Sequence, residues 1–269
     1  MVEPVSKDAR GIIAPAAGLT RFRLDRYPPS AGVARFVDRY WAVTWDLRGR
    51  PDFTQRVFAH PVVNVVFTPG GAATVHGPTT RVSEQTLRGA GWVLGVMFRP
   101  AGFRPFLGRP MTGILDTVLD LGDVLGADAA TAAATVAAAP DGAARAAAVD
   151  RFLAERLPRH RQPAEDTTAV AELAAADPAV VTVERLAAGA GLSVRQLQRR
   201  FADHVGLGPK AVIRRYRLYE AAERARLGGD VAWARLAAEL GYSDQSHLTR
   251  EFTAYIGVPP HRYRRACRD

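Results

Sequence analysis

The C-terminal third of this 269-residue chain contains the same short pattern twice. Both copies contain Arg-Leu-Ala-Ala, beginning at Arg185 and at Arg235, which are 50 positions apart. Both then contain a glycine and a Leu-x-x-x-Phe motif, which ends at Phe201 in one copy and at Phe252 in the other, now 51 positions apart. Two copies of a short helix, a glycine turn and a second helix predict an all-α domain with two helix-turn-helix motifs, which commonly read DNA.

Capping residues mark the helices of both copies, which we call the first head (residues 182–209) and the second head (residues 230–260). In the first head, Thr182 and Ser193 are placed to cap two helices, and Gly191 suits the left-handed turn between them. In the second head, Asp230 and Ser243 occupy the corresponding positions. We therefore expect each head to fold as helix, tight turn and helix.

The second helix of each head is predicted to have one buried face and one polar face. In the first head Leu197, Phe201 and Val205 recur at helical spacing and mark the buried face. On a polar face that enters the major groove, arginine suits guanine and glutamine suits adenine. Alone, such a face is more often merely solvated, and it is the duplicated context that favours base contact. The expected base-contacting residues are Arg195, Gln198 and Arg199 in the first head and Gln245, Ser246, Thr249 and Arg250 in the second.

A longer helix is predicted to join the heads, because Pro209 suits a first helical turn and Gly228-Gly229 would end the helix after Leu227. Arginines on this helix and near the C-terminus are candidate phosphate contacts, with a solvated charge as an equal alternative. They are Arg214, Arg215 and Arg217 on the helix, and Arg262, Arg264 and Arg265 beyond the second head.

The net charge lies mostly on the repeated region. The formal charge is +9, and residues 180–269 hold 16 Lys and Arg against 9 Asp and Glu, while the other residues hold 20 against 18. Such a basic excess is typical of nucleic-acid binding, although it would also suit an anionic membrane surface.

Over about residues 168–265, these motifs resemble the AraC/XylS family of bacterial transcription regulators. The resemblance implies a seven-helix unit with two helix-turn-helix motifs, and it puts the base contacts on the same residues as above. It implies a sequence-specific regulator with double-stranded DNA as its partner, RNA polymerase as a further partner if it activates, and neither catalysis nor a cofactor. Trp233 departs from the pattern, since a smaller or polar residue is expected there. The motifs that carry the resemblance are Leu186-Ala187, Gly191-Leu192-Ser193, Leu197-Gln198-Arg199-Arg200-Phe201, Gly206, Pro209, Leu236-Ala237, Leu240-Gly241-Tyr242-Ser243-Asp244-Gln245-Ser246-His247-Leu248, Arg250-Glu251-Phe252, Gly257-Val258-Pro259-Pro260 and Tyr263-Arg264.

The chain as a whole is predicted to be an α+β multi-domain protein. Residues 1–26 show no sustained period and are expected to be loosely ordered. Residues 27–112 alternate short apolar runs with Gly/Pro turns, which predicts a β-rich domain shaped like a barrel or sandwich. Residues 113–164 are expected to form a helical connector and linker, because alanine dominates residues 127–148. Residues 165–269 form the predicted DNA-binding domain.

The predicted β-rich domain is expected to bind a small-molecule effector or to form a homodimer. Arg99 and Arg104 flank a Pro/Gly turn and could hold an anionic effector, but the sequence favours salt bridges for both. The alternative function is a constitutive DNA-binding protein whose N-terminal half only dimerises, for instance through the alanine-rich helices.

Other classes of protein fit the sequence poorly. A metal-dependent cupin-like enzyme fused to a DNA reader would use His60, His76 and Glu84, but these are not clustered as metal-binding cupins require. The single cysteine, Cys267, excludes an internal disulfide and a multi-cysteine zinc site. With no signal-peptide pattern and no apolar stretch long enough for a bilayer, we expect a cytoplasmic, nucleoid-associated protein with no membrane partner.

Overall fold

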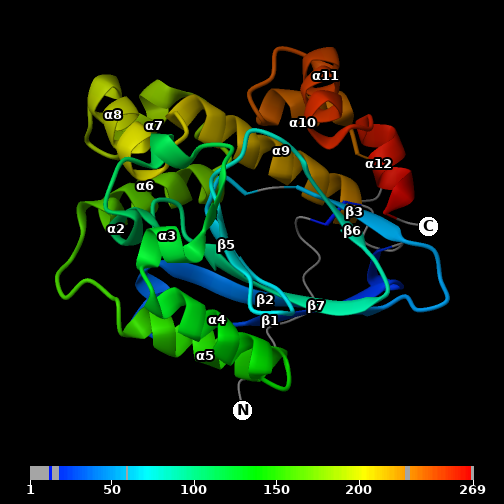
Figure 1. Ribbon diagram of the computed structural model, residues 1–269. Helices are drawn as coiled ribbons and strands as arrows, with labels where there is room; N and C mark the ends of the chain where they lie inside the picture. The colour runs from blue at the N-terminus through cyan, green and yellow to red at the C-terminus, as the bar shows by residue number, and fades with distance from the viewer. Residues whose placement is uncertain (1–11, 14–17, 59, 228–230, 268–269) are drawn as a thin grey trace.

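The computed structural model describes residues 12–13, 18–58, 60–227 and 231–267. A β-rich part is followed along the chain by an all-helical part (Figure 1). The strands are β1 (Phe22–Tyr27), β2 (Val37–Asp46), β3 (Phe53–Val57), β4 (Asn64–Phe67), β5 (Ala73–His76), β6 (Ser83–Leu87), β7 (Ala90–Phe98) and β8 (Val118–Asp120), and the short helices among them are η1 (Val33–Arg35), α2 (Arg104–Leu107) and η2 (Met111–Ile114).

One antiparallel sheet contains β1, β2, β7, β4, β5 and β8 in that order, while β3 and β6 pair separately as a two-stranded ribbon. One face of the large sheet is core, because alternate residues such as Tyr40 and Ala42 on β2 and Leu94 and Val96 on β7 are buried on the same side. The ribbon is joined to the sheet by a smaller apolar cluster, which includes Leu47 and Leu87. The predicted β-rich domain is thus confirmed.

The alanine-rich segment forms helices that cover the core face of the sheet. They are α3 (Leu121–Leu125), α4 (Asp128–Ala138) and α5 (Gly142–Ala154), and in Figure 1 α4 and α5 lie beneath β1 and β2. Ala133, Val136, Val149 and Phe152 are buried in the same cluster as the strands. These helices are therefore part of the sheet's core as well as the connection to the rest of the chain, and we call the unit from β1 to α5 the β domain.

The expectation of loose order up to residue 26 is wrong for residues 22–26. Strand β1 pairs with β2 along its whole length, from Phe22 opposite Trp45 to Tyr27 opposite Tyr40. The buried ring of Phe22 packs against Leu47 and Leu87, which anchors the start of the strand. Most residues before position 18 lie outside the described part of the chain.

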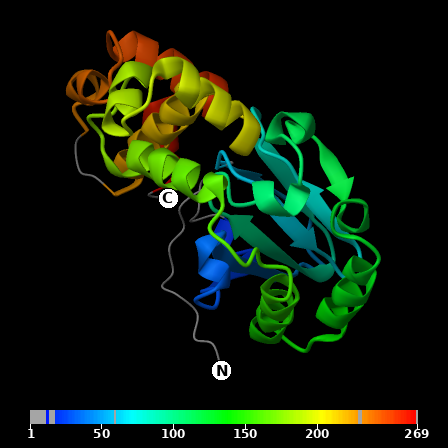
Figure 2. The same ribbon diagram turned by 90° about the vertical axis from the view of Figure 1, so that its left-hand side faces the viewer.

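The helical domain runs from α6 to α12 and lies beside the β domain (Figure 2). Helix α6 begins at Pro163 and is capped by Gln162 and Glu165. The first and second heads have separate apolar cores, one around Leu197 and Phe201 and one around Leu248 and Phe252. The predicted pair of helix-turn-helix motifs is confirmed. The helices are α6 (Pro163–Ala176), α7 (Val183–Gly189), α8 (Val194–His204), α9 (Pro209–Leu227), α10 (Trp233–Glu239), α11 (Gln245–Ile256) and α12 (Pro260–Ala266).

Candidate DNA interface

The first head folds as its capping residues predict. Thr182 caps α7 by accepting a hydrogen bond from the backbone N–H of Arg185 at 3.2 Å. Gly191 adopts a left-handed φ of +65° between the helices. Ser193 then caps α8, and its own N–H donates to the side chain of Gln196 at 2.9 Å, which completes a capping box. The direction in which α8 leaves the turn is therefore fixed locally.

The second head has the same architecture with two changes at its caps. Helix α10 begins at Trp233 with Ala232 at its N-cap, and Asp230 lies outside the described residues. Helix α11 is capped by Asp244 rather than Ser243, because the Asp244 carboxylate accepts from the N–H of His247 at 2.7 Å. A carboxylate interacts more favourably than a hydroxyl with the positive end of a helix dipole, and this hydrogen bond lowers the pKa of Asp244. The predicted cap at Ser243 is one residue too early.

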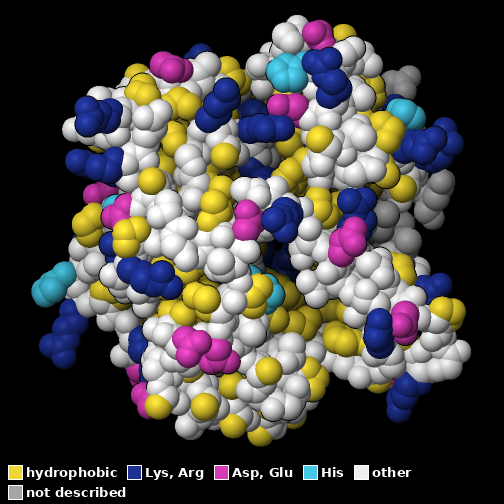
Figure 3. Space-filling view, turned by 45° about the horizontal axis from the view of Figure 1, so that its top comes forward, with side chains coloured by type: hydrophobic (Ala, Val, Ile, Leu, Met, Phe, Trp, Pro, Cys, Tyr) yellow, Lys and Arg dark blue, Asp and Glu magenta, His cyan; other side chains and the backbone are white. Residues whose placement is uncertain are grey.

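The seven residues expected to contact bases lie on the outer sides of α8 and α11. Arg195, Gln198 and Arg199 are exposed on α8, while Leu197 and Phe201 on the opposite side are fully buried. On α11, Gln245, Ser246 and Arg250 are exposed and Thr249 is half-buried, opposite the buried Leu248 and Phe252. Base contact by these residues stays a prediction, and their accessibility is compatible with it. Figure 3 shows Lys and Arg side chains distributed over the upper part of the molecule, where the helical domain lies.

The linker helix α9 separates the heads, and one of its arginines is an exposed candidate for phosphate contact. Arg214 is 52% exposed, and its Nε donates to Glu251 on α11 at 2.7 Å. The Glu251 carboxylate thus joins α9 to the second head, and it also lies 3.6 Å from His247 of its own helix. Phosphate contact by Arg214 stays a prediction, and its accessible side chain is compatible with it.

Two further arginines of α9 are structural, and the expectation that they contact phosphates is wrong. Arg215 is 6% exposed; its Nη2 donates to the carbonyl of Thr79 at 2.8 Å, and its guanidinium lies 4.3 Å from the ring centre of Tyr255. Arg217 is 3% exposed and donates to the carbonyls of Ala174 and Asp177 at the end of α6. Burial lowers the pKa of both guanidinium groups. Neither side chain can reach DNA without leaving the core.

The C-terminal candidates on α12 differ in accessibility. Arg262 and Arg265 are exposed, whereas Arg264 is half-buried. Phosphate contact by these arginines stays a prediction.

Arg99 and Arg104 join the two domains and do not form an anion site. Arg99 follows β7, and its Nη1 donates to Glu172 on α6 at 2.5 Å. Arg104 on α2 donates through Nε to Asp203 on α8 at 2.9 Å. Each guanidinium is thus occupied by a carboxylate of the helical domain, and the salt-bridge alternative is correct.

The three candidate ligands of the enzyme alternative do not form a metal site. His60 stacks on Tyr219 with ring centres 4.1 Å apart, the His76 ring is hydrogen-bonded to Thr74, and Glu84 pairs with Arg56. Among the described residues, no group of three or more His, Cys, Asp or Glu side chains is arranged to hold a metal ion. No helix in the described ranges is long and apolar enough to span a bilayer.

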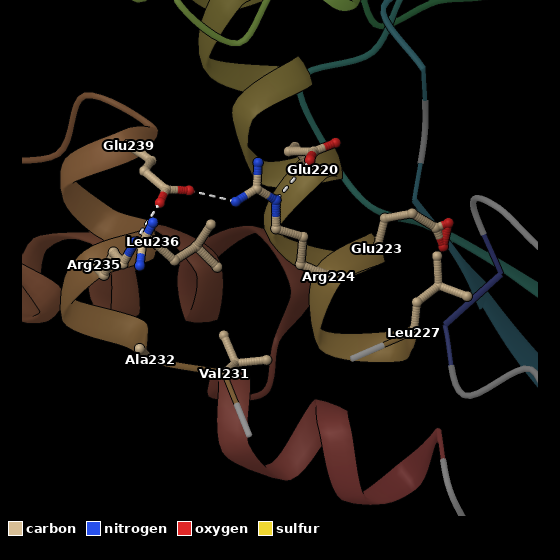
Figure 4. A pocket seen from close by; sticks show the side chains of 9 residues that line it. All are labelled: Glu220, Glu223, Arg224, Leu227, Val231, Ala232, Arg235, Leu236 and Glu239. Atoms are coloured by element: carbon tan, nitrogen blue, oxygen red, sulfur yellow. Dashed lines mark hydrogen bonds and ion pairs between the residues drawn. The ribbon is translucent and has the colours of Figure 1, made fainter. Parts of the chain in front are cut away.

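A groove in the second head was not anticipated from the sequence. Figure 4 shows it between α9 and α10, where Arg224 donates to Glu220 at 2.7 Å and to Glu239 at 2.5 Å. Leu227 of α9 and Leu236 of α10 are among the apolar residues that line the same groove. The residues lining the groove are Glu220, Glu223, Arg224, Leu227, Val231, Ala232, Arg235, Leu236 and Glu239.

Comparisons with known families match each domain separately. A family described as a helix-turn-helix domain matches residues 186–266, which include α8 and α11. A family described only as a domain of unknown function matches residues 25–120, within the β domain.

Sequence similarity to two relatives covers 31% of this chain in each case. A putative AraC-like transcription regulator of Streptomyces lividans is 37% identical over 84 residues, which are 31% of this chain and 27% of that protein. The multiple antibiotic resistance protein MarA of Escherichia coli is 32% identical over 84 residues, which are 31% of this chain and 65% of MarA. The chain therefore spans less than two thirds of the length of either relative.

Solved structures give weaker likenesses. An AraC-type regulator from Chromobacterium violaceum has a TM-score of 0.35 at 20% identity, covering 38% of this chain and 91% of that one. ToxT from Vibrio cholerae has a TM-score of 0.43 at 8% identity, covering 91% of this chain and 98% of that one.

Proposed function

The C-terminal part of this chain is an AraC-type helix-turn-helix domain, and from this premise we propose that the protein is a sequence-specific, DNA-binding transcription regulator. The observation that carries the proposal is the pair of capped helices, α8 and α11, each with a buried apolar side and an accessible polar side. A single polar helix face is commonplace, but two such faces in duplicated heads joined by one helix match the arrangement that reads two major-groove segments.

The two heads would recognise DNA with different chemistry. Arg195 and Arg199 give α8 two cationic side chains, which can donate to guanine or to phosphate. Helix α11 offers mainly neutral donors and acceptors, with Arg250 as its exposed cation. The 19 residues of α9 give a helix of roughly 28 Å, comparable to the turn of B-DNA, about 34 Å, that separates successive major-groove faces.

We further propose that the β domain regulates this binding. It contacts the helical domain through Arg99–Glu172 and Arg104–Asp203, and through the Tyr219 hydroxyl, which donates to the carbonyl of Phe58 at 2.5 Å. A conformational change within the β domain can therefore alter the positions of the heads through these contacts. Dimerisation alone is the alternative role, and RNA polymerase is the further partner if the protein activates transcription.

A small-molecule effector would fit best on the side of the sheet opposite α4 and α5. Trp41 donates there to Asn64 at 3.1 Å, and His76 lies opposite Asn64 in the sheet register. Figure 3 shows a central hollow with hydrophobic, His and Arg or Lys side chains around it. Apolar walls with a few polar groups are typical of small-molecule sites. Titrating a compound panel while following Trp fluorescence and DNA affinity tests this role, and a panel without any effect on DNA affinity favours a constitutive binder.

Selection from a random DNA pool at physiological salt tests the central proposal. Full-length protein is expected to enrich a motif with two blocks about one helical turn apart. A variant with Arg195→Ala and Arg199→Ala is expected to lose the block read by the first head. The matched control carries Arg48→Ala and Arg88→Ala, two exposed arginines of the β domain paired with Asp46 and Asp52. An unenriched pool with the unmodified protein contradicts sequence-specific binding.

A further inference from the structure

The two recognition helices end in the same way, and the β domain meets both of them at that point. Gly206 follows α8 and Gly257 follows α11, at equivalent positions of the repeat. Both adopt left-handed backbone conformations, with φ of +83° and +85°. Only glycine adopts this conformation without strain, which explains a glycine at each helix end.

At the first head, the β domain approaches through η2. A β-carbon built onto Gly206 would lie 2.9 Å from the carbonyl oxygen of Met111. One turn earlier on the same helix, Asp203 forms its ion pair with Arg104 of α2 at 2.9 Å. The C-terminal end of α8 is therefore held by a close backbone contact and a charged hydrogen bond.

At the second head, the β domain approaches through β3 and the residues after it. A β-carbon built onto Gly257 would lie 2.4 Å from both terminal nitrogens of Arg56. The guanidinium thus lies at the C-terminal end of α11, where the helix dipole favours a cation. Phe58 packs edge-on against Tyr255 of α11, with ring centres 4.7 Å apart. Glu84 of β6 forms an ion pair with Arg56 at 3.1 Å.

The two contacts are mechanically connected, whereas the heads are not connected by a common core. Helices α8 and α11 belong to different apolar clusters, and α9 contributes residues to each. On the other side, η2 lies in the core of the large sheet, and the β3–β6 ribbon is tied to that sheet through Leu47 and Leu87. The β domain is thus a second link between the heads, besides α9.

The contacts leave the proposed DNA surface open. Arg195 and Arg199 lie within the first six of the eleven residues of α8, and Gln245, Ser246 and Arg250 lie in the first half of α11. The β domain contacts both helices at their C-terminal ends. A domain that covered the reading faces would block DNA, and this one does not cover them.

Building on the proposed function, we propose that the β domain is a brace that sets the spacing and orientation of the two recognition helices. It contacts α8 and α11 at equivalent positions of the repeat, the C-terminal ends of the two helices, and so holds both heads in one fixed arrangement. A shift of η2 relative to β3 would change that arrangement, which makes the brace the element through which the β domain controls DNA binding.

Binding to DNA of altered spacing tests the brace. The probes are a duplex selected by the unmodified protein and the same duplex with one or two base pairs inserted between its blocks. Each inserted pair displaces one block by about 3.4 Å and rotates it by about 35°. The braced protein is expected to lose at least about tenfold in affinity per inserted pair, as for a mismatch in a specific site.

The test variant is the full chain with Arg104→Gln and Arg56→Gln. It is expected to bind the parent duplex at least about threefold more weakly and to lose less than about threefold per inserted pair, because the heads can adjust. A chain with Arg48→Gln and Arg88→Gln removes the same charge at exposed pairs of the β domain and should behave like the unmodified protein. Exchanging the partners, by Arg104→Asp with Asp203→Arg, should restore the insertion penalty lost in Arg104→Gln alone.

The outcomes separate the two proposals. The brace is overturned if the test variant loses as much affinity per inserted base pair as the control does. It is also overturned if the test variant binds the parent duplex more tightly than the unmodified protein, because the contacts would then hold the heads in an arrangement that disfavours DNA binding. Failure of the unmodified protein to select any duplex counts against DNA recognition itself. If the chain with both Arg104→Gln and Arg56→Gln does not unfold cooperatively, two other variants test the brace: Arg104→Gln alone, and Arg104→Asp with Asp203→Arg. The quantity compared is again the loss of affinity per inserted base pair.

Discussion

Replacing Arg217 separates structural arginines from DNA-contacting ones. Its guanidinium is buried, and Nη2 donates to two carbonyls at the end of α6, including that of Asp177 at 3.0 Å. Methionine keeps most of the apolar stem but donates no hydrogen bond. Hydrogen bonds to a charged group contribute about 1.5–3 kcal/mol each, and relief of the buried charge offsets part of their loss. We therefore expect Arg217→Met to lower the free energy of unfolding by about 2–4 kcal/mol.

Two measurements on the same variant decide between the roles. Urea unfolding followed by circular dichroism gives the loss of stability, and Arg217→Lys is expected to lose less because its ammonium group keeps the charge and can still donate hydrogen bonds. The dependence of DNA affinity on salt gives the number of phosphate contacts, since each contact contributes a slope of about 0.9. For Arg217→Met the slope should not change. A slope reduced by about one, with unchanged stability, would refute the structural assignment.

Three further predictions test the heads. Arg199→Ala should cost about 1–3 kcal/mol of binding to the selected duplex and relax preference at one base pair, and an equal loss on every sequence would make Arg199 a phosphate contact. Phe201→Ala should lower the free energy of unfolding by about 3–5 kcal/mol, and a loss below about 1 kcal/mol in denaturant titrations would contradict its place in the core. Burial lowers the pKa of His204, so the unfolded chain binds protons more readily than the folded protein. The free energy of unfolding should therefore fall as the pH drops from about 7.5 to 5.5. Unfolding curves for His204→Gln should show a weaker dependence of stability on pH, and an unchanged dependence would contradict this prediction.

Local signals made the helical domain predictable. A helix cap depends on residues within one turn, so Thr182 and Ser193 could be assigned from sequence spacing alone. The apolar period likewise placed Leu197 and Phe201 in the core. The cap at Ser243 was missed by one residue because Asp244 beside it is a competing cap of the same kind.

Burial that depends on distant segments could not be predicted in this way. Arg215 is buried by Thr79 and Tyr255, which belong to different elements, and nothing adjacent in the sequence announces those contacts. One signal was available: Arg215 lies three residues after the buried Val212 and seven before the buried Ala222, so it falls on the inner stripe of α9.

The same limitation explains the outcome at Arg99 and Arg104. Two arginines flanking a Pro/Gly turn look alike whether their partner is a ligand or a carboxylate from another domain, since both satisfy a guanidinium. Only the folded chain distinguishes the cases, because Glu172 and Asp203 come from α6 and α8.

The domain interface also explains why an arginine-rich chain needs specific carboxylates. Arg35, Arg99 and Arg104 of the β domain face a helical domain that is itself basic, so direct contact would be repulsive without compensation. Glu165, Glu172 and Asp203 provide it, and Arg35 lowers the pKa of Glu165 through its hydrogen bond. Placing Asp203 at the end of α8 keeps the β-domain contact away from Arg195 and Arg199, which are exposed earlier on the same helix. Attraction between the domains and attraction to DNA therefore use different parts of α8, so the contact that positions this helix does not compete with DNA for its exposed cations.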